Sequence, residues 1–208
     1  IKTADEIIEI DGYNYDSADK EELVIGTGEN IINIYYTKKT DLTYKVNYLE
    51  KETNEIIKDQ KIVENITFGT TIRATNEIVT INGYNYDSVD KDVLIIGTGE
   101  NIINIYYTKR NNLTYRVNYL EKDTNEILHE QKIARNVIFE STINATNEII
   151  EIDGYDYDSK DKEILTITTG ENIINIYYTK RTDLNYKVNY LEKGTNKVLS
   201  KQKTVNNV

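Results

Sequence analysis

The thirteen-residue segment GTGENIINIYYTK occupies residues 26–38 and returns unchanged at residues 97–109. A third copy, TTGENIINIYYTK, fills residues 168–180, so the copies are spaced by 71 residues without insertion or deletion. Other motifs keep the same interval, since GYNYDS occurs twice and GYDYDS once. An internal period of this regularity predicts a fold built from copies of one unit.

The 71-residue period favours small independent domains over a solenoid. Solenoid repeats are about 20–50 residues long and cannot bury a core alone, whereas the longer unit found here is in the size range of small domains. The 18 tyrosines fall into six sets of three equivalent positions. A single catalytic centre gives no reason for such triplication, but an array that gains reach or avidity does.

Patterns of apolar residues predict a β-rich α+β fold for each unit. Apolar and polar residues alternate over residues 42–50, as in a half-buried strand. Residues 55–64 are the second expected strand, joined to the first by the turn KETNE. Residues 101–108 carry apolar side chains on both faces, as a central strand would. Between them, ATNEI predicts one short helical turn with Thr75 as its cap.

We expect complete repeats at residues 41–111 and 112–182. The links TKKTD, TKRNN and TKRTD lack the Gly or Pro of a hairpin turn, so they are interpreted as short connections between domains. With this phase, residues 1–40 are the C-terminal part of a repeat, and residues 183–208 are the N-terminal part of another.

A rival phase places the boundaries near residues 67–71 and 138–142. The segment TFGTT is the only part of a repeat that is absent when the two chain ends are compared. Phe68 and Phe139, the only phenylalanines, lie in these two loops, so a boundary there would damage the fold if they were core residues. A third possibility is that the partial repeats of neighbouring molecules complete each other by strand exchange.

Composition excludes several classes of function. The net charge of −10 argues against binding to nucleic acid and to anionic membrane surfaces. No apolar run approaches the roughly 18 residues needed to span a bilayer, so no membrane insertion is expected within this segment. The absence of cysteine rules out disulfides and thiolate metal sites. No signal peptide or sorting motif is visible, which predicts that the chain is an excerpt of a longer protein.

No catalytic residue, metal site or cofactor is expected, so the chain is predicted not to be an enzyme. The only histidine, His129, is replaced by Lys58 and Ser200 in the other copies, which argues for an exposed strand residue rather than a general base. The GTGEN segment leads into a strand, whereas a phosphate loop leads into a helix. Without cysteine or a repeated histidine, nucleophilic triads and zinc sites lack their parts.

The sequence contains residues for two further kinds of site, a calcium site and a Lys–Asn cross-link, but its pattern favours neither. Residues 153–163 hold five closely spaced carboxylates, which are ligands that calcium prefers. Asparagine replaces some of them in the other copies and the spacing is not that of an EF-hand, so a solvated turn is favoured. Lys45, Asn47 and Glu50 are of the residue types that form an intramolecular Lys–Asn cross-link. Lys45 and Asn47, however, are two positions apart on one strand, and a cross-link of this kind would join two different strands.

The order of the motifs YKVNYLEK, GY.YD and ENIINIYYTK resembles the mucin-binding-protein (MucBP) repeat of Gram-positive surface adhesins. Those repeats open with a V-x-Y strand, carry a Gly-Tyr pair past the middle and close on a strand that ends in tyrosine. The corresponding residues here are Val46, Tyr48, Gly83, Tyr84 and Tyr107. One departure is the hairpin turn, where EKETNE replaces the usual Asp-Gly type.

The resemblance implies small β-grasp-like (ubiquitin-like) repeats joined end to end in an elongated array. It also implies an extracellular location on the bacterial cell surface, with cell-wall anchoring through regions outside this segment, and mucin or host glycans as partners. One expected function is an adhesin whose repeats bind weakly and gain avidity from repetition. The alternative is a non-binding stalk that projects a distal binding domain, and short linkers without glycine favour the limited flexibility that a stalk needs.

Tyrosine–aspartate pairs are the expected glycan-binding residues. Aromatic rings stack on the C–H groups of sugars, and carboxylates accept hydrogen bonds from sugar hydroxyls. The pairs lie in turn-like segments, where binding residues concentrate. The alternative interpretation is that about two-thirds of the tyrosines are core residues. The expected site residues are Tyr15, Asp16, Tyr86, Asp87, Tyr157 and Asp158.

Overall fold

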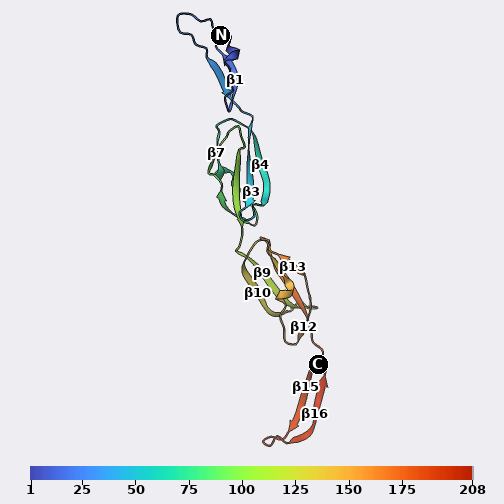
Figure 1. Ribbon diagram of the computed structural model, residues 1–208. Coiled ribbons are helices and arrows are strands. Elements are labelled where there is room, and N and C mark those ends of the chain that lie inside the picture. Colours follow the sequence, from blue (N-terminus) through green and yellow to red (C-terminus); the bar gives the residue numbers. More distant parts are fainter. Residues whose placement is uncertain (208) are drawn as a thin grey trace. The chain divides into compact units, whose positions relative to one another are not determined.

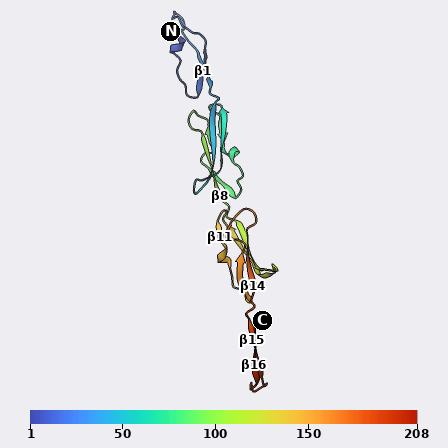
Figure 2. The ribbon, with the colours of Figure 1, turned by 90° about the vertical axis from the view of Figure 1, so that its right-hand side faces the viewer.

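The computed structural model describes residues 1–207, which are rich in β-strands (Figures 1 and 2). The chain forms two compact units, the first from Ile1 to Lys109 and the second from Arg110 onward. The β-rich character is as predicted, but the only helices in the described residues are three short 3₁₀ helices, so the α-helical part of the expected class is missing. Within residues 1–207, no helix has the length and apolar character needed to cross a membrane.

A four-stranded sheet with the order β4-β3-β8-β6 is the centre of the first unit. Strands β3 (Leu42–Glu50) and β8 (Ile102–Lys109) pair in parallel in the middle. Strands β4 (Ile56–Ile66) and β6 (Tyr84–Val89) flank them in antiparallel pairing. The first and last strands of this sheet along the chain therefore lie side by side (Figure 1).

The predicted hairpin of β3 and β4 is confirmed. The Glu50 carboxylate closes its turn by accepting the backbone N–H groups of Glu52 and Thr53, at 3.0 and 2.7 Å. Asn54 supplies the left-handed residue, with φ at 58°. Asparagine adopts this conformation more readily than most residues, because its short polar side chain bonds locally. The turn can therefore form without the glycine of the Asp-Gly type.

A small second layer covers one face of this sheet. It consists of β5 (Thr71–Arg73), the 3₁₀ helix η2 (Ala74–Glu77) and β7 (Val93–Ile95). The predicted helical turn is confirmed as η2, but its N-cap residue is Arg73 rather than Thr75. The residues buried between the two layers are Tyr44, Val46, Tyr48, Ala74, Leu94, Ile96, Ile103, Ile105 and Tyr107.

The other face of β8 is only half-buried, so the expectation of burial on both faces is wrong. A row of polar side chains crosses the sheet on this face instead. Gln60 donates to Asn47 at 2.6 Å, Asn47 donates to Asn104 at 2.8 Å, and Asn104 donates to Asp90 at 3.1 Å. We call these four residues the amide ladder. Because it links β4, β3 and β8 to the residue directly after β6, the amide ladder helps to fix their register.

The repeated GTGEN segment is a turn organised by its asparagine. The buried Asn101 side chain accepts a hydrogen bond from the backbone N–H of Gly97 at 2.9 Å. It donates to the carbonyl oxygens of Gly97, Gly99 and Thr43, at 2.9, 3.2 and 3.2 Å. Because Thr43 belongs to β3, one side chain both closes the turn and fastens it to the sheet. The predicted tight turn before the last strand is confirmed.

We expect Asn101→Ala to lower the free energy of unfolding of the first unit by about 2 kcal/mol, because it leaves several buried polar groups unpaired. Urea denaturation measures this loss. The matched control is Asn30→Ala, which alters the equivalent turn at an exposed asparagine and should cost much less. Equal losses in the two variants would contradict the assigned role of Asn101.

The second unit repeats this architecture with the sheet order β10-β9-β14-β12. Strands β9 and β14 pair in parallel, and all nine core positions of the first unit are again buried 71 residues later. The elements are β9 (Leu113–Glu121), β10 (Ile127–Val137), β11 (Thr142–Asn144), η3 (Ala145–Glu148), β12 (Tyr155–Lys160), β13 (Ile164–Thr166) and β14 (Ile173–Lys180).

Both ends of the described chain carry part of this architecture. The N-terminal part contains η1 (Thr3–Asp5), β1 (Tyr13–Ala18) and β2 (Ile34–Lys38), which are equivalent to η2, β6 and β8. The C-terminal part contains β15 (Asn185–Leu191) and β16 (Val198–Asn206), a hairpin equivalent to that of β3 and β4. Each part forms a sheet of two strands.

A buried glutamate links the two layers of the first unit. The Tyr44 hydroxyl donates to Glu77 at 3.0 Å, and Lys61 contacts the other carboxylate oxygen at 2.5 Å. Burial raises the pKa of Tyr44, and the hydrogen bond with Glu77 raises the pKa of Lys61. The second unit has the same arrangement in Tyr115, Glu148 and Lys132.

We expect the midpoint of thermal unfolding to fall as the pH rises above about 10. Because burial raises the pKa of six core tyrosines, the folded chain keeps protons that the unfolded chain releases. The contribution of these tyrosines is complete below their unfolded pKa and is lost as the pH rises through the folded values. Lys61, whose pKa is also raised, acts in the same direction. The tyrosines are Tyr44, Tyr48, Tyr107, Tyr115, Tyr119 and Tyr178.

Circular dichroism melts between about pH 8 and pH 12 test this expectation. The control is the same series at high salt, which screens general repulsion between surface charges but not the burial of tyrosine. An unfolding midpoint that stays constant across the series would show that tyrosine ionisation is not coupled to folding.

Candidate functional site

The three tyrosines expected to bind glycans occupy equivalent positions on the edge strands β1, β6 and β12. Tyr15, Tyr86 and Tyr157 are 45%, 46% and 41% exposed. Each ring meets edge-on the tyrosine paired with it on the neighbouring strand. The rings of Tyr86 and the buried Tyr107, for example, have centroids 6.2 Å apart and planes at 81°. The core tyrosine therefore positions the ring, and much of the ring stays open to a ligand.

Two of the neighbouring aspartates, Asp87 and Asp158, form ion pairs, whereas Asp16 accepts a hydrogen bond from Ser17 at 2.8 Å. Asp87 is the extra residue of a β-bulge in β6, and its carboxylate contacts Lys51 at 2.5 Å and Ser88 at 2.7 Å. The hydrogen bond with Lys51 lowers the pKa of Asp87. In the second unit, Asp158 pairs with Lys122 at 2.7 Å, which lowers the pKa of Asp158 in the same way. These carboxylates therefore fasten an edge strand to the residue after β3 or β9.

An open groove lies beside Tyr157 in the second unit, and an equivalent groove lies beside Tyr15 in the first. The lining of the former includes the segment 149–153, the start of β12, Tyr178 and Arg181. The latter is lined by residues 142 positions earlier in the chain. Two units described separately thus carry the same groove on equivalent residues.

One core tyrosine positions a wall of the groove in the second unit. The Tyr178 hydroxyl donates to the carbonyl oxygen of Ile150 at 2.9 Å and accepts the N–H of Ile150 at 3.2 Å. Both backbone groups of this irregular segment are therefore bound, although it belongs to no strand. Tyr36 makes the same two bonds to Ile8 in the first unit, at 2.9 and 3.2 Å.

Charges of both signs line the groove of the second unit. The Arg181 guanidinium donates two hydrogen bonds of 2.9 Å to Asp183, and its Nε lies 4.0 Å from Asp156. Hydrogen bonding to Arg181 lowers the pKa of Asp183. The lining also contains Ile150 and Ile152, so polar groups and apolar surface lie together. Such a surface can accept a ligand that has both hydroxyl groups and C–H faces.

In the second unit the structure separates two residues that were expected to act together, whereas Tyr15 and Asp16 both line one hollow of the N-terminal part. Tyr157 lines the groove, whereas the carboxylate of Asp158 is directed to Lys122. The segment 149–153 was not predicted as part of a site, because an irregular segment shows no strand periodicity. One sequence pattern does point to this segment. An apolar residue, any residue and an isoleucine occur in that order shortly before each Gly-Tyr pair. The carboxylates in the lining are those of Glu151, Asp153 and Asp156.

The five carboxylates of residues 153–163 do not converge on one point. Asp161 accepts hydrogen bonds from the backbone and side chain of Asn175, at 3.0 and 3.1 Å. Glu163 pairs with Lys160 at 3.0 Å. In the part of the chain that the structure describes, no group of three or more acidic, histidine or cysteine residues is placed to hold a metal ion.

His129 and Asn47, which the sequence also singled out, make contacts with neighbouring side chains of the sheet. His129 is exposed on β10, as predicted, and its ring meets that of Tyr119 edge-on with centroids 5.5 Å apart. The carboxamide of Asn47 both accepts and donates a bond within the amide ladder. Asn47, one of the residues considered for a cross-link, is therefore already hydrogen-bonded to side chains of the same sheet.

No protein-family model and no curated protein matches the chain. Among solved structures, the chain is similar to the crystal structure of Mub-RV, at 12% sequence identity. The similarity covers 67% of this chain and 99% of the other, with a TM-score of 0.25. This TM-score is too low for the likeness to indicate a fold or a function.

Proposed function

We propose that this chain is a tandem-repeat region of a Gram-positive cell-surface adhesin whose repeats each bind mucin or other host glycans weakly. In this proposal the chain is extracellular, is anchored to the cell wall through other regions, and has no enzymatic activity. The observation that carries the proposal is the groove beside Tyr157, which recurs on equivalent residues beside Tyr15. Equivalent sites on one chain raise the overall affinity through effective concentration.

We further propose that residues 41–111 and 112–182 are the complete repeats, and that each is a β-grasp-like unit. Support comes from the two parallel pairs, β3 with β8 and β9 with β14. Each pair places the first and last strands of one proposed unit in the centre of its sheet, between antiparallel edge strands.

The groove contains groups that recognise sugars elsewhere in proteins. The exposed part of the Tyr157 ring offers an apolar face to sugar C–H groups, and Arg181 and the lining carboxylates offer partners to sugar hydroxyls. Because the wall at Ile150 is already held by Tyr178, little ordering is needed on binding.

Binding of the 208-residue chain to immobilised mucin, before and after enzymatic removal of the glycans, tests the adhesin proposal. We expect glycan-dependent binding that falls at least about tenfold in the triple variant Tyr15→Ala, Tyr86→Ala, Tyr157→Ala. The loss of about 1 kcal/mol of aromatic contact per site is multiplied over linked sites.

The matched control is a second triple tyrosine variant on the strands β2, β8 and β14, at positions that face away from the core. It should keep binding, because these rings do not line the grooves. Equal losses in the two triple variants, or glycan binding unaffected by the first, would refute the assigned surface. The control substitutions are Tyr35→Ala, Tyr106→Ala and Tyr177→Ala.

The contacts of Phe68 favour the second function, a non-binding stalk. A Cβ placed on Gly12 would lie 2.3 Å from the Phe68 ring, and the Tyr13 ring meets Phe68 edge-on at 5.6 Å. The Phe68 N–H donates to the carbonyl of Lys39 at 2.8 Å, and the Lys39 N–H donates to the carbonyl of Gly12 at 2.9 Å. Within the first unit, the connection between β2 and β3 is therefore bonded on both sides, as a stiff spacer requires.

We expect Phe68→Ala to accelerate tryptic cleavage after Lys38 and Lys39 about tenfold, because the connection then opens more often. Gly12→Ala should have the same effect, since the added Cβ has no room and φ is +78°. Cleavage after Arg181 serves as the internal reference. A wild-type chain that is already cleaved at the connection as fast as the variants would remove the support for the stalk.

A further inference from the structure

Carboxylates surround the arginine in the groove of the second unit. Asp183 accepts two hydrogen bonds from the Arg181 guanidinium, and Asp156 lies 4.0 Å from its Nε. Hydrogen bonding to Asp183, together with the charges of Asp183, Asp156 and Asp153, raises the pKa of Arg181. A contact of two parallel bonds between a guanidinium and a carboxylate is strong and directional. An acidic ligand would therefore have to compete with Asp183 for this side of the guanidinium.

The lining of this groove carries an excess of negative charge. Among the described residues that line it, three are carboxylates and one is a cation. Lys160, whose ammonium group lies 6.0 Å from the centre of the Tyr157 ring, is paired with Glu163 at 3.0 Å. A cleft lined mainly by one sign of charge attracts ligands of the opposite sign and repels those of its own. The charged residues of the lining are Glu151, Asp153, Asp156 and Arg181.

The groove beside Tyr15 has the same sign of charge. Its lining contains Glu9, Asp11 and the cation Lys39, each 142 positions before its equivalent in the second unit. Carboxylates therefore outnumber cations in both grooves.

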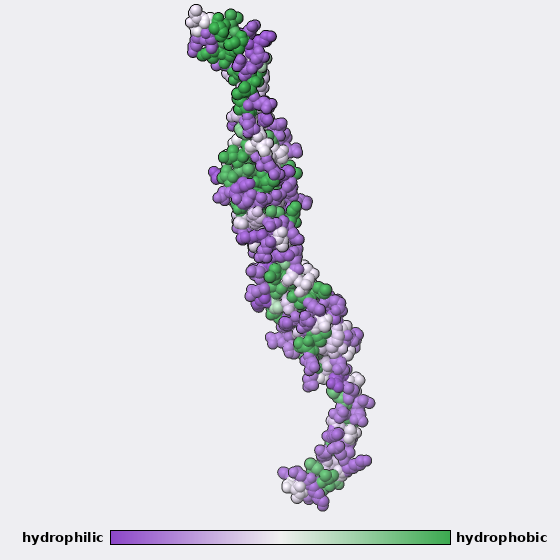
Figure 3. All heavy atoms as spheres, viewed as in Figure 1, coloured by the Kyte–Doolittle hydropathy of each residue, from purple (hydrophilic) through white to green (hydrophobic). Residues whose placement is uncertain are grey.

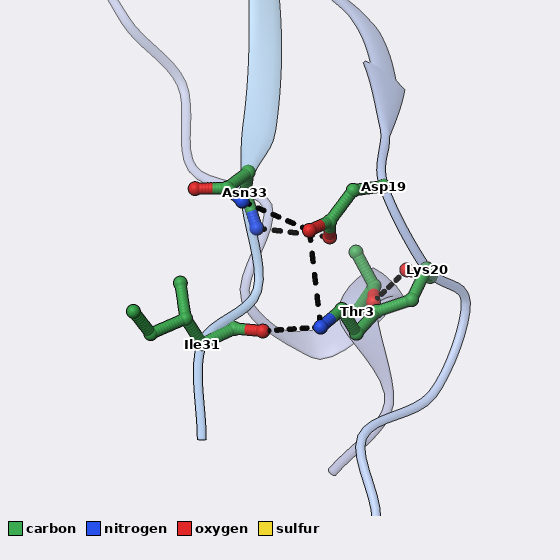
Figure 4. A network of polar contacts seen from close by, with 5 residues as sticks. All are labelled: Thr3, Asp19, Lys20, Ile31 and Asn33. Atoms are coloured by element: carbon green, nitrogen blue, oxygen red, sulfur yellow. Dashed lines mark hydrogen bonds and ion pairs between the residues drawn. The ribbon is translucent and has the colours of Figure 1, made fainter. Parts of the chain in front are cut away.

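A repeated polar network holds the edge strand beside each groove. Directly after β1, Asp19 accepts the backbone and side-chain N–H groups of Asn33, at 3.0 and 2.9 Å (Figure 4). Directly after β12, Asp161 accepts the same two bonds from Asn175, at 3.0 and 3.1 Å. The two edge strands are thus fixed alike, so the charges of the two grooves can be compared residue by residue.

The middle copy of the sequence replaces every carboxylate around the arginine and keeps the arginine as Arg110. The first copy keeps three of the four carboxylates, the exception being Asn14. The copies therefore differ in the charge around this cation, although they agree in the neighbouring tyrosine. The neutral residues of the middle copy are Thr80, Asn82, Asn85 and Asn112, in place of Glu151, Asp153, Asp156 and Asp183.

Apolar surface lies beside the charges of the groove. Ile149, Ile150 and Ile152 line it together with Tyr157. Figure 3 shows apolar side chains interspersed among hydrophilic ones over the visible face of the second unit. An uncharged sugar can use both kinds of surface, because its C–H groups pack on apolar side chains and its hydroxyls donate to carboxylates.

We propose that the groove of the second unit selects uncharged sugars and rejects sugars that carry a carboxylate or a sulfate group. This inference rests on the proposed glycan binding and adds the class of sugar that the site accepts. The carboxylates that accept bonds from the hydroxyls of an uncharged sugar repel the charge of an acidic one, and such repulsion is a source of specificity. Arg181 does not offset this repulsion, because Asp183 already compensates its charge.

Nuclear magnetic resonance of the 208-residue chain tests the proposal. The ligands are oligosaccharides released from mucin and separated by anion exchange into a neutral and an acidic fraction, and the amide signals of residues 149–157 report on this groove. At low salt, we expect the neutral fraction to bind at least about fivefold more tightly than the acidic one. The ratio should fall toward one at about 1 M salt, because the screening length shrinks to about 3 Å.

A variant that gives the groove the residues of the middle copy should lose this discrimination. The acidic fraction should bind it at least about fivefold more tightly than it binds the wild type, and the affinity of the neutral fraction should change by less than about twofold. The fold accommodates these residues, because the first unit already contains them at equivalent positions. The substitutions are Glu151→Thr, Asp153→Asn, Asp156→Asn and Asp183→Asn.

A matched control removes the same amount of charge elsewhere on the second unit. Four exposed carboxylates outside the lining are replaced, so the net charge changes equally while the groove keeps its own charges. This variant should discriminate as the wild type does, which separates the local charge from the net charge. The control substitutions are Asp123→Asn, Glu126→Gln, Glu130→Gln and Glu171→Gln.

Failure of this inference is distinguishable from failure of the proposed function. An acidic fraction that binds the wild-type groove as tightly as the neutral one, or more tightly, would refute the selection and leave glycan binding in place. The same holds if the exchange of four residues leaves the discrimination unchanged, or if the control variant loses it as well. If neither fraction shifts the signals of residues 149–157, the proposed binding function of this groove fails and the inference fails with it.

Discussion

The parallel pairing of β3 with β8 is the interaction on which the first unit depends. Six residue pairs join the two strands, although paired residues such as Asn47 and Asn104 are 57 positions apart in the chain. The two edge strands, the shared core, the amide ladder and the anchorage of Asn101 to Thr43 all require this contact.

Local features of this fold could be predicted from the sequence, whereas the pairing of distant strands could not. Alternation identified the strand at residues 42–50, and turn composition identified the hairpin that follows. The partner and direction of each strand depend on packing between segments far apart in the sequence. The half-buried face of β8 illustrates this limit, because isoleucine and tyrosine on that face fit a buried strand equally well.

The candidate site shows the same division between local and distant information. Tyr86 is exposed, as expected for a binding residue, but it lies on strand β6 and not in the turn-like segment that was predicted. The ion pair of Asp87 with Lys51 joins two segments that are distant in the chain. The contacts of Phe68 are similar, since a loop phenylalanine has no visible role until Gly12 of the preceding segment lies against it. Residue type alone was therefore not enough to predict the structural roles of Asp87 and Phe68.

The parallel pair also determines how the first unit carries a pulling force. The chain enters this sheet at Leu42, where β3 starts, and leaves it at Lys109, where β8 ends, so the two points lie at opposite ends of neighbouring parallel strands. Tension applied there shears the strands along each other. All the backbone bonds between them, together with the Asn47–Asn104 contact, then share the load at once instead of opening one after another. A unit built in this way resists extension along the line that joins Leu42 and Lys109.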